Sequence, residues 1–281
     1  MSSALALDAR SRSRTAVRAS LPPEQWTANE TFTRGLVAEL QQHPFARHPL
    51  VADMNAGRVT SAWLRHFYLD TVYALSGRFI EYVLQAVVNC AQVRERVGQR
   101  GVAAARFLMQ INAIDELGFE PGDAGGGFKG DPARAHLVQL YDVMKQMGIG
   151  EQEADQHRPS PAAQRMYDAL EENRHDHLRL ATLLAAYEST LSPWSSAWAR
   201  ATRAATAVDV DRGYHAIHVE DEHGSAVDDD HSEDSWHIVR QALTPERHNE
   251  VRQLAFDLMD TCAAYVDYQH DLLRSQKKLV S

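Results

Sequence analysis

Three ionisable side chains occupy positions where a buried helix face would normally carry an aliphatic residue: Glu116, His136 and Glu188. The residues one or two helical turns away from each of them are apolar. These neighbours are Met109 and Ala113 for Glu116, Leu140 and Val143 for His136, and Ala181, Leu184 and Leu191 for Glu188. An unpaired charge on such a face is costly, so each side chain needs a partner. A core hydrogen bond or ion pair explains any one of them alone, whereas all three together favour a shared metal site.

A second group of metal-binding residue types is concentrated in residues 214–237, where histidines alternate with carboxylates. The histidines are His215, His218, His223, His231 and His237. A histidine and a carboxylate three or four residues apart share one face of a helix, as chelation of a metal requires. The pairs His218/Glu222 and Asp228/His231 both have this spacing. A solvated acidic helix would explain the carboxylates but not the imidazoles, so this segment also indicates a metal site.

The residue types restrict which metal could be bound. The chain has 14 histidines but only 2 cysteines, Cys90 and Cys262, each in an apolar helical stretch where a buried free thiol is expected. The ligands would therefore be nitrogen and oxygen atoms, a set that suits iron or manganese as well as zinc.

The composition excludes several classes of partner. Of the 281 residues, 44% are hydrophobic and 24% are charged, and the net charge is -9. An acidic surface argues against a nucleic-acid partner, which requires a basic face to neutralise phosphates. No apolar run is long enough for a signal peptide or a membrane span. We therefore expect a cytoplasmic protein that acts on a small-molecule substrate.

Helical periodicity runs through the chain, and strand signals are nearly absent. Residues 1–25 are predicted to be a flexible segment, and residues 26–281 to form a single helical domain. The predicted helices cover residues 29–42, 62–93, 101–117, 131–147, 161–191 with a break near 173–175, 196–243, and 245–275. The glycine-rich residues 119–130 are interpreted as a flexible surface insertion, and Gly118 as a left-handed helix cap. Seven or eight helices joined by short loops indicate a compact all-α bundle.

The order of these features resembles the haem-oxygenase-like diiron oxidases and oxygenases, iron-containing redox enzymes of the haem-oxygenase/pyrroloquinoline-synthase-like superfamily. That family carries a Glu that ends one helix, often in a DE-G phrase, and a His that opens the next. A second Glu follows in a phrase like AAYE, and then a His-x3-Asp-x2-His motif with an acidic stretch and Trp. Glu116, His136 and Glu188 match the first three positions, and Asp228 and His231 followed by SEDSW match the end of the fourth. The resemblance covers about residues 30–275 and implies a haem-oxygenase-like bundle.

Two departures from the family pattern concern the site. The gap between the first Glu and the His is longer than usual, which a loop can absorb while both ends stay in place. The fourth motif would require a histidine at position 224, which is Gly224, and His223 comes one residue early. A π-bulge would restore the common face, or His218 is the ligand with Glu222 as its partner. Two ligand sets therefore remain open: His223, Asp228 and His231, or a set built on His218 and Glu222.

The resemblance implies two Fe(II) ions between the helices and O2 as co-substrate. One iron would be held by Glu116, His136 and the carboxylate of the histidine-rich segment, and the other by Glu188 and two histidines of that segment. Side chains cannot reduce dioxygen unaided, so the metals would carry that chemistry. The expected activity is N-oxygenation or oxidative C–C cleavage of a small amine or amino acid in a biosynthetic pathway. Homodimers are common in this fold, so the resemblance is compatible with a homodimer here.

Two other interpretations compete with this one. A metal-free oxidase or hydrolase of the same superfamily would hold no stoichiometric iron. A non-enzymatic helical binding protein would lose no Fe(II)-dependent stability when His136 or His231 is replaced by alanine, because no metal would be linked to folding.

Overall fold

The computed structural model describes the backbone of residues 2–121, 128–218 and 227–280, and the side chains of residues 9–119, 129–218 and 230–276. Within these ranges almost all regular structure is helical, which confirms the predicted all-α class. The α-helices are α1 (Ser2–Arg18), α2 (Pro23–Leu40), α3 (Pro49–Asn55), α4 (Ser61–Ala74), α5 (Phe79–Asn89), α6 (Arg94–Glu116), α7 (His136–Gln146), α8 (Glu151–Asp155), α9 (Pro161–Glu171), α10 (His177–Glu188), α11 (Ser192–Ala205), α12 (Tyr214–His218), α13 (Val227–Ala242) and α14 (His248–Val280).

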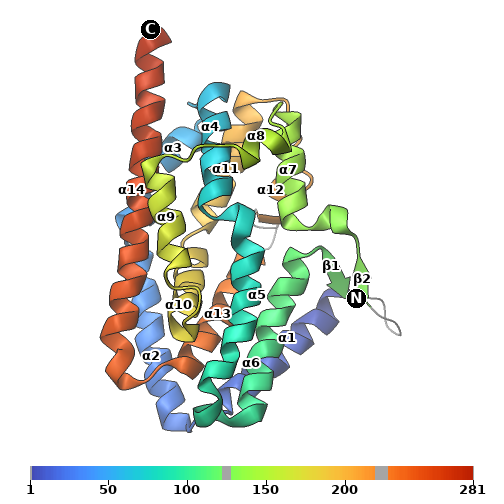
Figure 1. Ribbon diagram of the computed structural model, residues 1–281, viewed down its shortest axis with the longest axis vertical. Coiled ribbons are helices and arrows are strands. Elements are labelled where there is room, and N and C mark those ends of the chain that lie inside the picture. Colours follow the sequence, from blue (N-terminus) through green and yellow to red (C-terminus); the bar gives the residue numbers. More distant parts are fainter. Residues whose placement is uncertain (1, 122–127, 219–226, 281) are drawn as a thin grey trace.

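The helices form an elongated bundle with α10 and α13 near its centre (Figure 1). α10 packs against both α13 and α14, and α1 packs against α6 and α13. α14 follows one side of the molecule along its long axis, while α1 and α6 lie on the opposite side of the lower half. α7 and α12 contact each other at the upper end. Helices from distant parts of the sequence therefore surround α10, which carries Glu188.

Local sequence signals explain where several helices begin. Thr60, Ser160 and Asp176 each accept a hydrogen bond from a backbone N–H in the first turn of α4, α9 and α10. Such a cap satisfies a donor that the helix itself leaves unpaired. At α9 the sequence itself marks the start, because the cap Ser160 is followed by Pro161, which suits the first turn of a helix.

Two of the long helices expected from the sequence are interrupted. The helix predicted over residues 62–93 breaks at Leu75, whose φ of -152° and ψ of -59° are not helical, and a 3-10 turn follows before α5. The helix predicted over residues 196–243 is divided into α11, α12 and α13. Both predictions were wrong because apolar periodicity continues across breaks that tertiary packing decides.

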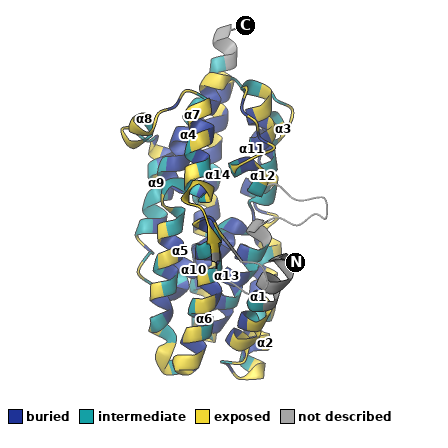
Figure 2. Ribbon diagram, turned by 90° about the vertical axis from the view of Figure 1, so that its right-hand side faces the viewer, coloured by how far each residue is buried: buried dark blue, intermediate teal, exposed yellow. Residues whose placement is uncertain are grey.

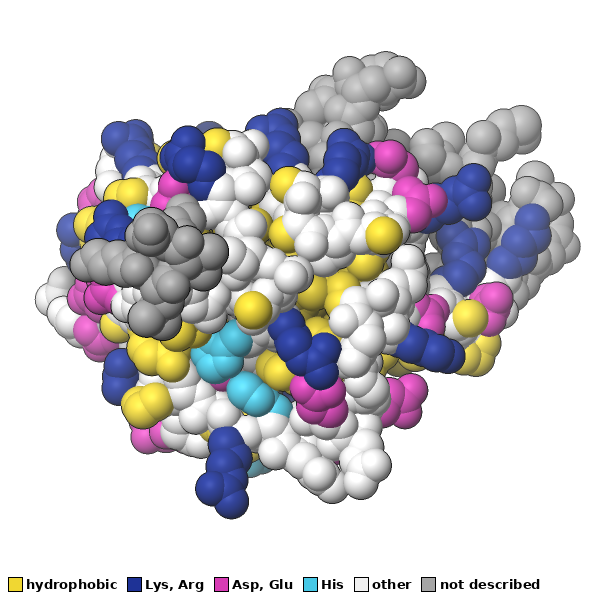
Figure 3. All heavy atoms as spheres, turned by 90° about the horizontal axis from the view of Figure 1, so that it is seen from above, with side chains coloured by type: hydrophobic (Ala, Val, Ile, Leu, Met, Phe, Trp, Pro, Cys, Tyr) yellow, Lys and Arg dark blue, Asp and Glu magenta, His cyan; other side chains and the backbone are white. Residues whose placement is uncertain are grey.

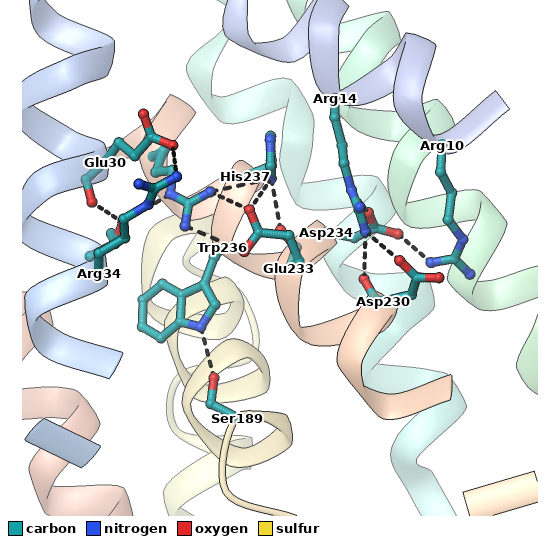
Figure 4. A network of polar contacts seen from close by, with 12 residues as sticks. Arg10, Arg14, Glu30, Arg34, Ser189, Asp230, Glu233, Asp234, Trp236 and His237 are labelled. Carbon is teal, nitrogen blue, oxygen red and sulfur yellow. Dashed lines mark hydrogen bonds and ion pairs between the residues drawn. The ribbon is translucent and has the colours of Figure 1, made fainter. Parts of the chain in front are cut away.

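Within the N-terminal segment that the sequence predicted to be flexible, residues 2–18 form the helix α1. Arg10 and Arg14 of this helix both bind the fully buried carboxylate of Asp234 on α13 (Figure 4). Ion pairs with another helix therefore help to hold this segment in place, together with Val17, which is buried in the core. A composition rich in arginine and serine concealed that role.

The core lies along the middle of the bundle, where buried residues are concentrated in Figure 2. Every residue of α10 is buried except Arg179 and Tyr187. Three tryptophans, Trp26, Trp63 and Trp236, are almost completely buried. Seen from above, one end of the molecule carries intermixed basic and acidic side chains around its rim, with hydrophobic side chains and histidines nearer its middle (Figure 3). No helix in the described parts of the chain is both long and apolar enough to cross a bilayer.

Candidate metal centre

Glycine geometry brings Glu116 and His136 together. Gly118 ends α6 with a φ of +79°, the left-handed conformation expected for a cap. A side chain there would lie 2.6 Å from the backbone nitrogen of Ala135 and 2.8 Å from the carbonyl oxygen of Asp131. Only glycine admits this close approach of the end of α6 to the start of α7. Glu116 and His136 therefore face each other across it.

A two-stranded ribbon accommodates the long insertion between these residues. Strands β1 (Phe119–Pro121) and β2 (Phe128–Gly130) pair antiparallel, with Phe119 opposite Gly130. The ends of the glycine-rich segment are thus adjacent, so its length does not separate the chain on either side. Strand signals are weak in this segment because the ribbon is only three residue pairs long.

Glu116 and His136 are both buried, and Nδ1 of His136 lies 3.1 Å from Oε2 of Glu116. This nitrogen nevertheless has no hydrogen-bond partner. The distance is short enough for a bond, so it is the direction that fails. A buried polar atom without a partner is costly. A bound cation would remove this cost, because it requires ligand atoms that point at a common position rather than at each other.

His231 of α13 joins the same cluster and is 1% exposed. Its Nδ1 lies 3.7 Å from Oε1 of Glu116 and 3.8 Å from Oε1 of Glu188. Its Nε2 donates a hydrogen bond to Oδ2 of Asp115, 3.0 Å away. A proton fixed on Nε2 leaves the lone pair of Nδ1 directed at the two glutamates. Metal-binding histidines are commonly oriented by a carboxylate in this way.

The electrostatics of the cluster call for positive charge. Burial by itself would lower the pKa of His231, but the hydrogen bond to Asp115 and the charges of Glu188 and Glu116 outweigh burial and raise the pKa to about 9. Burial would raise the pKa of Asp115, and the contact with His231 lowers it instead. A proton on His231 or a divalent cation beside it would equally offset these buried carboxylates.

Glu188 is the last residue of α10, and α13 holds it in place. Ser235 of α13 donates a hydrogen bond to Oε2 of Glu188 at 3.4 Å. One residue further on, Ser189 accepts a hydrogen bond from the indole of Trp236 at 2.8 Å (Figure 4). These bonds fix the end of α10 against the helix that carries His231.

An apolar cavity of about 240 Å³ opens beside the cluster. Glu116, His136 and Glu188 form part of its wall. Most of the remaining wall is aromatic or aliphatic, from α4, α5, α7, α11 and α14, and includes Phe67, Phe79, Leu140, Trp194, Trp198 and Tyr265. No lysine or arginine lines it among the residues that the structure describes. Among these lining residues, only histidines could therefore offset the charge of the two glutamates.

The structure brings together four of the eight residues that the sequence proposed as ligands: Glu116, His136, Glu188 and His231. His218 lies next to them, with its ring 5.1 Å from that of His136 and also in the cavity wall. Glu222, His223 and the side chain of Asp228 lie outside the described residues. The choice between the two ligand sets, and the π-bulge at Gly224, therefore stay predictions.

Asp115 is the residue of this site that sequence reasoning missed. It precedes Glu116 in the phrase DELG, so its position was visible. What the sequence lacked was its contact with His231, which lies 116 positions further along the chain.

A sequence model of the iron-containing redox enzymes matches residues 66–266, which is well over half of the chain. This chain belongs to that family. The match includes Glu116, His136, Glu188 and His231, and it confirms the resemblance on which the expected fold was based. No curated protein matches the chain.

Solved structures support the same fold for this iron-containing redox enzyme family member. A CadD-like protein of unknown function from Nostoc punctiforme is 15% identical with a TM-score of 0.63, over 88% of this chain and 99% of that chain. A TenA homologue from Pseudomonas syringae is 11% identical with a TM-score of 0.59, over 88% of this chain and 93% of that chain. At these identities the likeness concerns the fold alone.

The donor set fits the iron that the family description implies. Two imidazoles and two glutamates converge, one imidazole nitrogen is buried without a hydrogen bond, and a second imidazole is oriented by a carboxylate. Nitrogen and carboxylate ligands of this kind suit non-haem iron.

Proposed function

We propose that the chain is a non-haem diiron oxidase or oxygenase that uses O2 to oxidise a small, largely apolar metabolite. The observation that supports it most directly is the convergence of Glu116, His136, Glu188 and His231, from four helices, on one end of an apolar cavity. These four residues would hold two Fe(II) ions together with ligands from residues 218–228, either His223 and Asp228 or His218 and Glu222.

The irons, when bound, would supply the electrons that reduce dioxygen. The side chains around them have separate tasks. Asp115 holds the proton on Nε2 of His231 and so keeps Nδ1 directed into the cluster. Ser235 fixes one oxygen of Glu188. The apolar wall excludes water from the oxidising centre and so limits side reactions.

The cavity wall narrows the class of substrate. Apart from Glu116, Glu188 and the histidines, its polar side-chain groups are uncharged: hydroxyls, two indoles and one thiol. The hydroxyls of Thr71 and Tyr265 contact each other at 2.8 Å. A substrate carboxylate would find no guanidinium or ammonium group in this wall. We therefore infer that the amine or carboxylate of the substrate binds at the metal end, and that its apolar body lies among the aromatic side chains.

The alternative is a metal-free hydrolase of the same fold, a fold that a TenA homologue also has. The side chains of the cavity allow the two functions to be compared. A nucleophilic hydrolase of this shape would need an activated side chain such as a thiolate. Cys262 lines the cavity, but burial raises the pKa of its thiol to about 12. A thiol held neutral in this way is a poor nucleophile, so the cavity favours metal chemistry.

The test is iron stoichiometry combined with oxygen consumption. We expect the metal-free chain to bind two Fe(II) per chain under anaerobic conditions, and Glu188→Ala to bind one or none. Glu172→Ala, at an exposed glutamate of the segment between α9 and α10, is the matched control and should bind as much iron as the natural chain. Iron-loaded protein should consume O2 faster with apolar amines or amino acids than without them. Equal iron binding by the natural chain and Glu188→Ala would refute the proposal.

A further inference from the structure

A second cluster of metal-ligand residue types lies outside the cavity. Asp70 of α4 is fully buried, His66 lies one helical turn before it, and His157 follows α8. None of the three is part of the cavity wall described above. Phe67 and Thr71, the next residues of α4, do line the cavity. One helix therefore faces the cavity on one side and this cluster on another.

The three side chains point at one another. Nε2 of His157 lies 2.7 Å from Oδ1 of Asp70, and Nε2 of His66 lies 3.3 Å from Oδ2 of Asp70. One ligand atom from each residue lies within 4.8 Å of the other two. The imidazole rings are 5.9 Å apart and nearly perpendicular, at 72°. Two nitrogens and one oxygen thus surround a common point.

The contact of His66 is not a hydrogen bond. Its Nε2 is buried and has no hydrogen-bond partner, although the ring as a whole is partly exposed. Leaving such an atom unpaired beside a carboxylate is unfavourable. A cation bound between the residues would use this nitrogen as a ligand and remove the penalty.

The carboxylate is oriented from behind by two further donors. The backbone N–H of Ser160 donates to Oδ1 of Asp70 at 3.1 Å, and the amide of Gln269 donates to Oδ2 at 3.0 Å. Metal-binding carboxylates are usually held by such outer contacts. Ser160 belongs to the start of α9 and Gln269 to α14, so the cluster joins α4 to both.

The cluster lies just beneath the surface, since the side chains of His66 and His157 are 28% and 11% exposed while Asp70 is fully buried. A shallow hollow formed by α8 and its flanks, with Gln152, Gln156 and Arg158 in its wall, includes His157. Solvent could therefore supply the remaining ligand that two histidines and one carboxylate leave open.

We propose that His66, Asp70 and His157 bind one divalent transition-metal ion, with zinc as the best match. Two imidazoles and one carboxylate with an open fourth position are a common zinc ligand set, and zinc binds such sites more tightly than manganese or ferrous iron does. The ion fastens α4, which carries His66 and Asp70, to the segment between α8 and α9, which carries His157. It thereby fixes the helix whose other face forms a wall of the cavity. This site is independent of the diiron proposal.

The experiment compares zinc binding by the metal-free full-length chain and three variants, using calorimetric titration, elemental analysis and melting temperature. His66→Ala and His157→Ala each remove a proposed ligand. His43→Ala is the control, because His43 is also a buried histidine paired with one aspartate, Asp260, but belongs to no such cluster.

We expect the natural chain and His43→Ala to bind one zinc equivalent at this site. His66→Ala and His157→Ala should bind that equivalent at least tenfold more weakly, so that their tightly bound zinc is one equivalent lower. Zinc should raise the melting temperature less in these two variants. Because Nε2 of His66 makes no hydrogen bond, His66→Ala should melt within a few degrees of the natural chain when both lack metal. Equal zinc stoichiometry in the natural chain and His66→Ala, or a large loss of stability in metal-free His66→Ala with an unchanged response to zinc, would overturn the proposal.

Discussion

The ion pairs between α1 and α13 offer a sharp test of how the N-terminal helix stabilises the site. Arg10 contacts Asp234 at 2.6 Å and Arg14 contacts it at 2.7 Å (Figure 4). The double change Arg10→Met/Arg14→Met removes both positive charges and keeps most of the apolar side-chain volume. Asp234 would then be a buried carboxylate without a cation, three residues after His231.

The expected loss follows from burial. The side chain of Asp234 is 0% exposed and that of Arg10 is 10% exposed, so the pair belongs to the buried class. Breaking a buried ion pair by removing one partner costs about 3–5 kcal/mol. Each single change leaves one arginine in place and should cost less. The triple change Arg10→Met/Arg14→Met/Asp234→Leu should recover most of the loss, since a buried ion pair can often be replaced by apolar side chains of similar size.

The loss should also depend on pH. Burial raises the pKa of Asp234 in the natural chain, although Arg10 and Arg14 oppose the rise. Without the arginines the folded-state pKa rises further above the unfolded value. The folded state then binds more protons than the unfolded state between these two pKa values, so stability falls as pH rises through that window. The deficit of the double variant should therefore shrink between pH 7.5 and pH 5, by at most ~1.4 kcal/mol per pH unit.

Urea denaturation at both pH values measures these free energies. Arg34→Met is the control, because Arg34 pairs with Glu30 on the surface and its side chain is 72% exposed. Such a pair contributes about 0–1 kcal/mol. A loss below about 1 kcal/mol in the double variant, or the same loss at both pH values, would refute the claim that the ion pairs of Arg10 and Arg14 with Asp234 stabilise the packing of α1 on α13. Iron binding should weaken in parallel, because α13 carries His231.

Three further predictions concern single residues. Asp115→Asn should weaken Fe(II) binding roughly 10- to 100-fold by releasing His231, as measured by anaerobic competition with a chelator; unchanged affinity would contradict the role of Asp115. Gly118→Ala should lower the free energy of unfolding, measured by urea denaturation, by roughly 1–3 kcal/mol or more, because φ is +79° and the added carbon meets backbone atoms. An unchanged free energy would contradict the close approach of α6 to α7 at Gly118. Asn29→Ala should cost about 1–3 kcal/mol, because the buried Asn29 amide donates to two carbonyls at the end of α13; an unchanged urea midpoint would show that water replaces it.

The sequence alone identified the helical class and the ends of several helices. Apolar side chains repeated at the helical period, and the capping residue Ser160 preceded a proline. The same signal at Asp131 marks only a 3-10 turn, and the helix predicted from residue 131 begins at His136. These signals are local, because they act within one or two turns of the same helix. Glu116, His136, Glu188 and His231 were visible for a similar reason, as each is an ionisable residue in an apolar or histidine-rich stretch.

Contacts between distant residues were decided only by the tertiary structure. The polar composition of α1 favoured a flexible segment, and only the tertiary structure shows that Arg10 and Arg14 bind Asp234 of α13. His66 and Asp70 are one turn apart, but their third partner, His157, is 87 positions from Asp70. A sequence shows which side chains need a partner, because burial of charge is unfavourable wherever it occurs. Which partner each one finds depends on how the helices pack, and that is a property of the whole chain.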